Sequence, residues 1–154
     1  MTSTAAMPVG HRLAPVTKTV SQDKIDRFES LSRSLRSGQE EPAPSNLHTD
    51  AAQARRMGLA GPIASGQMSF AYLHELLARQ FGDDFLWGGR LSVTFVKPVA
   101  AGDTVTAQGV VQERRSEAGG PRTHYVLEVW LENQRGERTS LGEAQVTVPS
   151  PLRE

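Results

Sequence analysis

The spacing of the apolar residues changes near Asp84, and this change constrains the fold more than any other feature of the sequence. Upstream, residues 66–81 (GQMSFAYLHELLARQF) carry apolar side chains on almost every side, which predicts a largely buried helix. Downstream, apolar and polar residues alternate with period two, as they do in half-buried strands. One buried helix followed by a run of strands predicts an α+β domain in which an antiparallel sheet wraps around the helix.

Four strands are expected in the second half of the chain, and their short connections favour an antiparallel meander. They cover residues 91–95, 104–113, 125–132 and 144–148. Ahead of the buried helix, residues 11–20 have the pattern of a strand that Pro15 bends or confines to an edge. The other expected elements are a helix over 22–36 capped by Ser21, a loop over 37–47, and a short helix from Asp50 to about Gly58.

A chain of 154 residues has the size of one domain. Residues 1–10 are expected to form a flexible arm, residues 11–150 the domain, and residues 151–154 a tail. The 17 Lys and Arg residues balance the 17 Asp and Glu residues, so the chain has no basic excess to bind nucleic acid.

The sequence also predicts the cellular location of the protein. It has no run of roughly 18 apolar residues that would span a membrane. Its first residues lack the apolar run of a signal peptide, so a cytoplasmic location is expected. The sequence has no cysteine, which excludes thiol nucleophiles and disulfides.

Three short blocks carry residue types that suit chemistry. Asn46-Leu47-His48-Thr49-Asp50 places a histidine in a polar turn, and Gly61-Pro62-Ile63-Ala64-Ser65-Gly66 leads into the buried helix. The third block, Leu91 to Val99 followed by Gly102-Asp103-Thr104-Val105, joins two strands through a proline. In this order and spacing the blocks resemble the MaoC-like dehydratases, the (R)-specific enoyl-CoA hydratase group.

This resemblance implies a hotdog fold, in which an antiparallel sheet wraps around a long central helix. It also implies a hydro-lyase of fatty acid metabolism. Such an enzyme adds water to a 2-enoyl thioester, or removes water from a 3-hydroxyacyl thioester. The thioester of coenzyme A or of acyl carrier protein is the substrate, and no metal or resident cofactor is implied.

The resemblance assigns the chemistry to His48 as general acid and base and to the Gly66 N–H as donor to the thioester carbonyl. Histidine titrates near neutral pH, which suits proton transfer. The first N–H groups of a helix lack internal partners and lie at the positive end of the helix dipole. Two structural alternatives remain open. In the first alternative, His48 is a loop histidine that only makes hydrogen bonds. In the second, Gly66 only lets the helix and the sheet pack closely.

One departure from the family pattern leaves the reaction open. The family has an aspartate five positions before the histidine, and this chain has Ala43 there. Ser45 also replaces an asparagine of the family motif. Either Glu40 or Glu41 supplies the missing carboxylate, or His48 works alone, or only thioester binding is kept.

Other residues have weaker expected roles. Asn46, Ser65, Tyr72 and His74 are expected to bind substrate, and Arg55, Arg56 and Lys97 are candidates for contact with the phosphates of coenzyme A. Glu75 on the buried helix is the acid that a hotdog thioesterase would use.

Three functions therefore compete. They are a hydratase or dehydratase, a non-catalytic acyl-CoA-binding or regulatory protein, and a thioesterase. An exposed sheet edge is normally covered by association, so a homodimer, or a larger homo-oligomer built from dimers, is expected.

Overall fold

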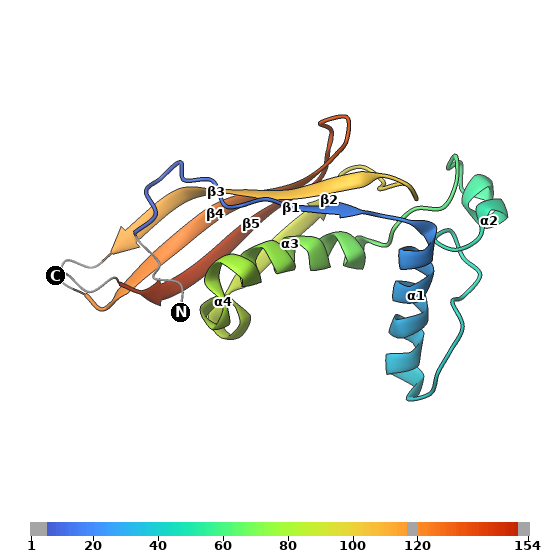
Figure 1. Ribbon diagram of the computed structural model, residues 1–154, viewed down its shortest axis with the longest axis horizontal. Coiled ribbons are helices and arrows are strands. Elements are labelled where there is room, and N and C mark those ends of the chain that lie inside the picture. Colours follow the sequence, from blue (N-terminus) through green and yellow to red (C-terminus); the bar gives the residue numbers. More distant parts are fainter. Residues whose placement is uncertain (1–5, 117–119, 151–154) are drawn as a thin grey trace.

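A computed structural model describes residues 6–116 and 120–150 of the protein (Figure 1). The chain folds into a sheet with one long helix beneath it and a pair of helices beyond its end. In chain order the elements are β1 (Val16–Thr19), α1 (Gln22–Ser37), α2 (Ala51–Arg56), α3 (Gly66–Phe81), α4 (Asp83–Gly88), β2 (Arg90–Phe95), β3 (Thr104–Ser116), β4 (Arg122–Asn133) and β5 (Arg138–Pro149). The predicted α+β hotdog architecture is confirmed.

The five strands form one antiparallel sheet in the order β1-β3-β4-β5-β2. The last three strands form the predicted meander, but β2 pairs with β5 rather than with β3, so the prediction of a four-strand meander is wrong. After β2 the chain crosses the end of the sheet, where the N–H of Val96 donates to Thr139 and the N–H of Gly102 donates to Val20. Alternation of residues sets the two faces of a strand and leaves its neighbours undetermined.

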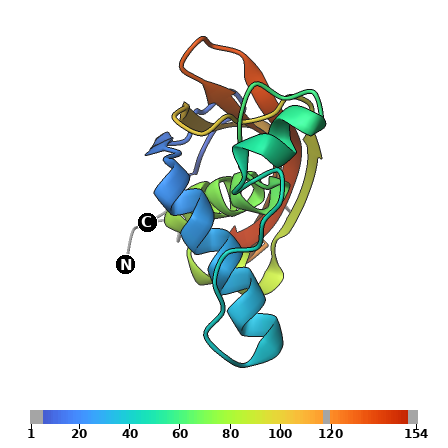
Figure 2. The same ribbon diagram turned by 90° about the vertical axis from the view of Figure 1, so that its right-hand side faces the viewer.

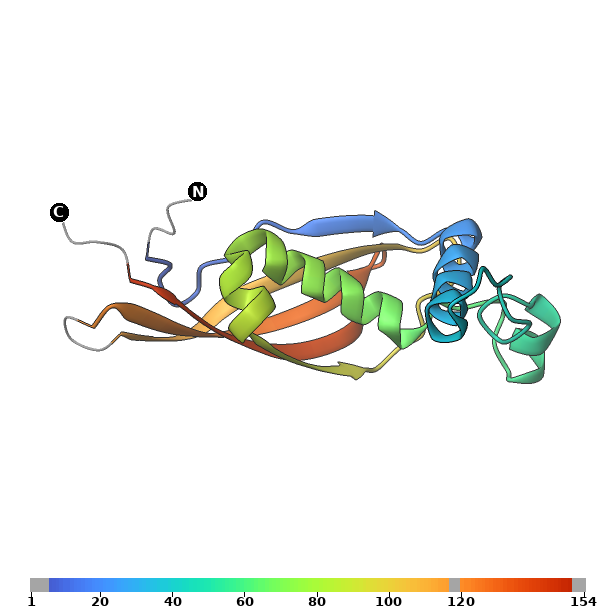
Figure 3. The same cartoon turned by 90° about the horizontal axis from the view of Figure 1, so that it is seen from below.

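Helix α3 lies across the concave face of the sheet, which curves around it (Figures 2 and 3). Leu73, Leu76 and Leu77 of the helix are buried against the inward-facing residues of the sheet. Burial is less complete than the sequence predicts, because 38% of Phe70 remains exposed. The sheet of a single chain covers one side of the helix and leaves the side with Phe70 uncovered.

Two local differences from the predicted elements have clear causes. Strand β1 is shorter than expected, because Pro15 leaves only an isolated bridge between Arg12 and Val110 upstream of it. Helix α4 was not predicted, since its six residues, which follow Gly82 with its positive φ, are too few to show a helical period.

The ends of the domain are only partly described. Met7, in the segment expected to be an arm, is buried, and its N–H donates to the Tyr125 hydroxyl at 3.2 Å. Residues 1–5 and the predicted tail at 151–154 lie outside the described residues. None of the helices in the described part of the chain has both the length and the apolar character needed to span a bilayer.

Helices α1 and α2 stand at the end of the domain where α3 begins (Figure 1). The Ser21 side chain caps α1, as predicted, and Gly38 ends the helix in a left-handed conformation. Asp50 caps α2 by accepting hydrogen bonds from the N–H groups of Ala52 and Gln53, which confirms the predicted cap. The loop between the two helices therefore runs back along α1 and delivers the His48 turn to the start of α3.

Candidate active site

The turn around His48 is held by hydrogen bonds on both sides of this residue. The His48 N–H donates to Asn46 Oδ1 at 2.8 Å. The His48 carbonyl accepts a hydrogen bond at 2.9 Å from the side-chain amide of Gln22, which lies in the first turn of α1. The backbone on either side of the imidazole is thus fixed before any ligand binds.

The imidazole itself is oriented by the segment that leads into α3. Its Nδ1 lies 2.8 Å from the carbonyl oxygen of Ile63. A backbone carbonyl only accepts hydrogen bonds, so Nδ1 must carry the proton. In neutral His48 the lone pair is therefore on Nε2, and this nitrogen is the one that could accept a proton.

The N-terminus of α3 is open. Ser65 occupies the N-cap position, yet its side chain makes no capping hydrogen bond. Within the described residues, the N–H groups of Gly66 and Gln67 have no hydrogen-bond partner. Both N–H groups lie at the positive end of a 16-residue helix, where an oxygen that gains negative charge is favoured.

His48 and Gly66 line the same pocket, which has a volume of about 340 Å³. Residues of all three sequence blocks form its wall, because the N–H of Ala64 donates to the carbonyl of Val99 and so joins the second block to the third. The lining is mainly apolar and comprises His48, Ile63, Ala64, Gly66, Ser69, Phe95, Val96, Lys97, Pro98 and Val99. A pocket with an apolar wall, a histidine and free backbone donors suits an acyl thioester.

The glycine at the start of α3 also has a packing role. A Cβ atom at Gly66 would lie 2.8 Å from Cε2 of Phe95, closer than a side chain normally tolerates. Both interpretations of Gly66 are therefore compatible with the geometry. The residue lets Phe95 pack closely, and it lines the pocket with an N–H that has no hydrogen-bond partner among the described residues.

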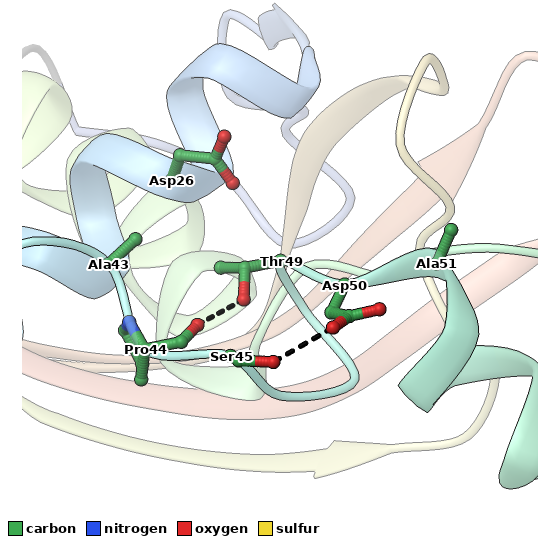
Figure 4. A pocket seen from close by; sticks show the side chains of 7 residues that line it. All are labelled: Asp26, Ala43, Pro44, Ser45, Thr49, Asp50 and Ala51. Carbon is green, nitrogen blue, oxygen red and sulfur yellow. Dashed lines mark hydrogen bonds between the residues drawn. The ribbon is translucent and has the colours of Figure 1, made fainter.

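Ala43, at the position where the family pattern has an aspartate, lines a different pocket from His48. Ala43 lines a second pocket of about 440 Å³, and Figure 4 shows the carboxyl group of Asp26 across this pocket from it. Among the described residues, none lines both pockets. Within the described segments, no carboxylate oxygen lies within 4.0 Å of a ring nitrogen of His48.

Neither glutamate proposed as a replacement acid occupies the His48 pocket. The Glu41 carboxylate forms an ion pair with Arg33 of α1 at 3.4 Å. Glu40 is exposed on the surface. Among the residues that the structure describes, His48 and Lys97 are the ionisable side chains that line the pocket.

The residues expected to bind substrate are not all brought to this pocket. His74 packs between the rings of Phe70 and Phe85, with centroids 6.4 and 5.1 Å away. Tyr72 packs against the core, and burial raises the pKa of its hydroxyl. Asn46 supports the turn, and Ser65 is buried beside the helix start. A substrate contact by these four side chains remains a prediction.

The charged candidates are mostly engaged with other residues. Hydrogen bonds from Lys18, together with Arg79, lower the pKa of the Glu75 carboxyl, and Glu75 does not line the His48 pocket. Lys97 lines the pocket, but its ammonium pairs with Glu137. Arg55 and Arg56 are exposed at the end of α2.

Sequence reasoning missed two parts of the site. One is Ser69, which lies one turn beyond Gly66 and lines the pocket. The other is Gln22, which ties α1 to the His48 turn. A serine inside an apolar helix and a glutamine in a first turn match no motif, so only the three-dimensional arrangement shows their roles.

Comparison with known proteins identifies the family. The MaoC-like domain model matches residues 4–130. The chain belongs to the MaoC-like family. An (R)-hydratase from A. caviae involved in PHA biosynthesis is 27% identical, with a TM-score of 0.69 over 92% of this chain and 96% of that one. A MaoC-like dehydratase from Rhodospirillum rubrum is 24% identical, with a TM-score of 0.69 over 95% of this chain and 96% of that one. A search of curated proteins gave no match.

As a MaoC-like protein, the chain keeps one part of the family site and changes another. His48 and Gly66 stand at the histidine and glycine of the motifs that the sequence resembles. Ala43 stands where that pattern has the aspartate. The histidine and the glycine of the pattern are thus present in this chain, whereas its aspartate is missing.

Proposed function

We propose that this protein catalyses the reversible hydration of a 2-enoyl thioester to a 3-hydroxyacyl thioester. One observation carries the proposal. The imidazole of His48 and the open N-terminus of α3 line a single apolar pocket. The likeness of the chain to an (R)-hydratase at 27% identity supports the same reaction. We also propose coenzyme A or acyl carrier protein as the carrier of the acyl group.

The chemistry follows from the two polar parts of the pocket. In the dehydration direction, His48 Nε2 removes the proton from the α-carbon of a 3-hydroxyacyl thioester. The electron pair of that C–H bond moves toward the thioester carbonyl, whose oxygen accepts hydrogen bonds from the Gly66 and Gln67 N–H groups. The bond from the β-carbon to oxygen then breaks, and the oxygen takes the proton from Nε2 and leaves as water. Hydration follows the same steps in reverse.

This assignment gives His48 both proton transfers. The proton that it takes from the α-carbon is the proton that it gives to the leaving oxygen, so no second acid is needed for balance. The hydrogen bond from Nδ1 to Ile63 keeps Nε2 directed away from the backbone throughout. A single base requires the α-hydrogen and the β-oxygen to lie on the same side of the substrate, which predicts syn addition of water.

The experiment is to follow the absorbance of the conjugated enoyl thioester after mixing crotonyl-CoA with the protein. Loss of this absorbance, with formation of 3-hydroxybutyryl-CoA, supports the proposal. Longer and branched enoyl-CoA substrates are tested in the same way. A protein that leaves all of them unchanged contradicts the hydratase assignment.

A non-catalytic acyl-thioester-binding protein is the second candidate. It is favoured by Ala43 and by the absence of a carboxylate within 4.0 Å of the His48 ring nitrogens among the described residues. Calorimetry with butyryl-CoA, which cannot be hydrated, separates the two functions. Tight binding without turnover of the enoyl substrate identifies a binder, and binding together with turnover identifies a hydratase.

The sheet edge supports a homodimer as part of the proposal. Strand β2 pairs with β5 on one side only, and exposed apolar side chains flank it. They are Leu86 and Trp87 before the strand and Phe95 and Val96 at its end. A twofold axis that pairs two antiparallel β2 strands brings the beginning of one strand to the end of the other. Trp87 of each copy then covers Phe95 and Val96 of the other.

A further inference from the structure

Ser69 combines burial with access to the candidate site. It lies one helical turn beyond Gly66, so both residues face the same side of α3. Only 5% of its surface is exposed, and it lines the pocket of His48 and Gly66. The hydroxyl oxygens of Ser65 and Ser140 are fully enclosed by protein and have no partner among the described residues. The hydroxyl oxygen of Ser69 is not enclosed in this way.

The hydroxyl of Ser69 has a free capacity for hydrogen bonding. No residue in the described segments forms a hydrogen bond with it. The Ser69 oxygen is open to the pocket whereas those of Ser65 and Ser140 are enclosed, so Ser69 is the one of these three hydroxyls that a ligand in the pocket can reach. The other polar side chains of the lining are already assigned, since Lys97 pairs with Glu137 and His48 is held by Ile63.

The reaction has one oxygen atom that needs a second partner. While His48 Nε2 accepts one proton of the attacking water, the other hydrogen of that water needs an acceptor. A serine hydroxyl can accept that hydrogen bond, and in the dehydration direction it accepts the same bond from the hydrogen of the leaving hydroxyl group. In the MaoC-like pattern a carboxylate stands near this step, and here Ala43 lines a different pocket.

We propose that the Ser69 hydroxyl binds the oxygen that is added to, or lost from, the β-carbon, and so serves in place of the missing carboxylate. The inference rests on the proposed hydratase function. Ser69 orients this oxygen and takes no proton from it, so every proton still moves through His48. Ser69 thus acts on the reacting atoms themselves and contributes little to binding the rest of the thioester.

The test compares Ser69→Ala with two matched variants. Ser140→Ala removes another buried hydroxyl that has no partner, but Ser140 lies on β5 and does not line the pocket. Ser69→Thr keeps a hydroxyl at the site. For each variant, kcat and KM are measured with crotonyl-CoA, and butyryl-CoA binding is measured by calorimetry.

The expected result is a fall of kcat by about a hundredfold in Ser69→Ala, the low end for loss of one transition-state hydrogen bond. KM and butyryl-CoA binding stay near the wild-type values. Ser140→Ala keeps the wild-type kcat, and Ser69→Thr recovers most of it. A purely structural role of Ser69 would lower stability and would not separate kcat from KM in this way.

Two results overturn the proposal, and they are distinguishable. If the wild type is active and Ser69→Ala matches it in kcat, the role of Ser69 is wrong while the hydratase function stands. If the wild type hydrates no enoyl thioester, the proposed function fails, and the role of Ser69 fails with it.

Discussion

The Nδ1 atom of His48 lies 2.8 Å from the carbonyl oxygen of Ile63, and this contact joins two parts of the chain that carry the candidate chemistry. It fixes the tautomer of the neutral imidazole, with the proton on Nδ1 and the lone pair on Nε2. The same contact shows which substitutions at position 48 separate structure from catalysis.

His48→Asn is expected to abolish turnover while the turn persists. The asparagine amide can still donate to the Ile63 carbonyl, but no atom replaces Nε2 as a base. The loss of kcat should be about 10²- to 10⁴-fold, the usual contribution of general acid–base catalysis. Steady-state kinetics with crotonyl-CoA measures it, and an unchanged melting temperature and butyryl-CoA affinity are the controls. Turnover by His48→Asn at the wild-type rate would exclude His48 as the proton carrier.

Gly66→Ala tests whether Gly66 serves packing or carbonyl binding. The added Cβ would lie 2.8 Å from Cε2 of Phe95, whose half-exposed ring can move aside. The stability change should therefore stay near the low end of overpacking effects, about 1 kcal/mol. The displaced ring and the new methyl group intrude on the pocket, so kcat/KM should fall by about tenfold to a hundredfold.

A matched glycine provides the control for this experiment. A Cβ at Gly61 would meet no atom of residues 6–116 or 120–150 within 4 Å, so Gly61→Ala should leave both stability and kinetics unchanged. If Gly66→Ala melts at a much lower temperature but keeps its kcat/KM, the residue serves packing alone.

The sequence predicts local turns and caps better than it predicts the sheet. The turn around His48 and the cap at Asp50 form from their own residues. The structure brings His48, Gly66 and Phe95 to one pocket, and the roles of His48 and Gly66 there stay predictions. The position of β2 beside β5 could not be read from the sequence, since strand pairing depends on where the crossing segment after Phe95 leads. Ser69 was missed for a similar reason, because one polar residue on an apolar helix shows its role only when the facing wall is known.

Ala43→Asp is expected to destabilise the protein without increasing its activity. The new carboxylate would share a pocket with Asp26 and would be separated from the His48 pocket. Repulsion between the two charges should lower the free energy of unfolding at pH 7 by about 0.5 kcal/mol. The loss should disappear below about pH 4, where aspartate takes up a proton.

Urea unfolding at pH 7 and pH 3.5, with Ala43→Asn as the uncharged control, measures this effect. Turnover of crotonyl-CoA is compared in parallel. A large gain in turnover by Ala43→Asp would mean that position 43 reaches the imidazole and that the separation of the two pockets is incorrect.

Glu137 is expected to make the stability of the protein depend on acid pH. A hydrogen bond from Lys97, aided by Arg135 and Asn133, lowers the pKa of the Glu137 carboxyl from 4.5 to about 2. The stabilisation by this carboxylate is thus fully present above pH 4.5 and is lost as the pH falls toward 2. The difference in unfolding free energy between wild type and Glu137→Gln should shrink between pH 7 and pH 3. An equal difference at both pH values would contradict the ionic origin.

The open edge of β2 predicts how the oligomer responds to charge. Trp87 is 88% exposed and Leu35, on α1, is 76% exposed, but only Trp87 lies next to β2. Trp87→Glu would put a charge into the proposed dimer contact, so light scattering after size exclusion should show a shift from dimer toward monomer. Leu35→Glu adds the same charge far from this edge and should leave the dimer intact.

Because each copy is proposed to cover Phe95 of the other, Trp87→Glu should also weaken butyryl-CoA binding. A dimer that survives Trp87→Glu but dissociates with Leu35→Glu would place the contact on α1 instead.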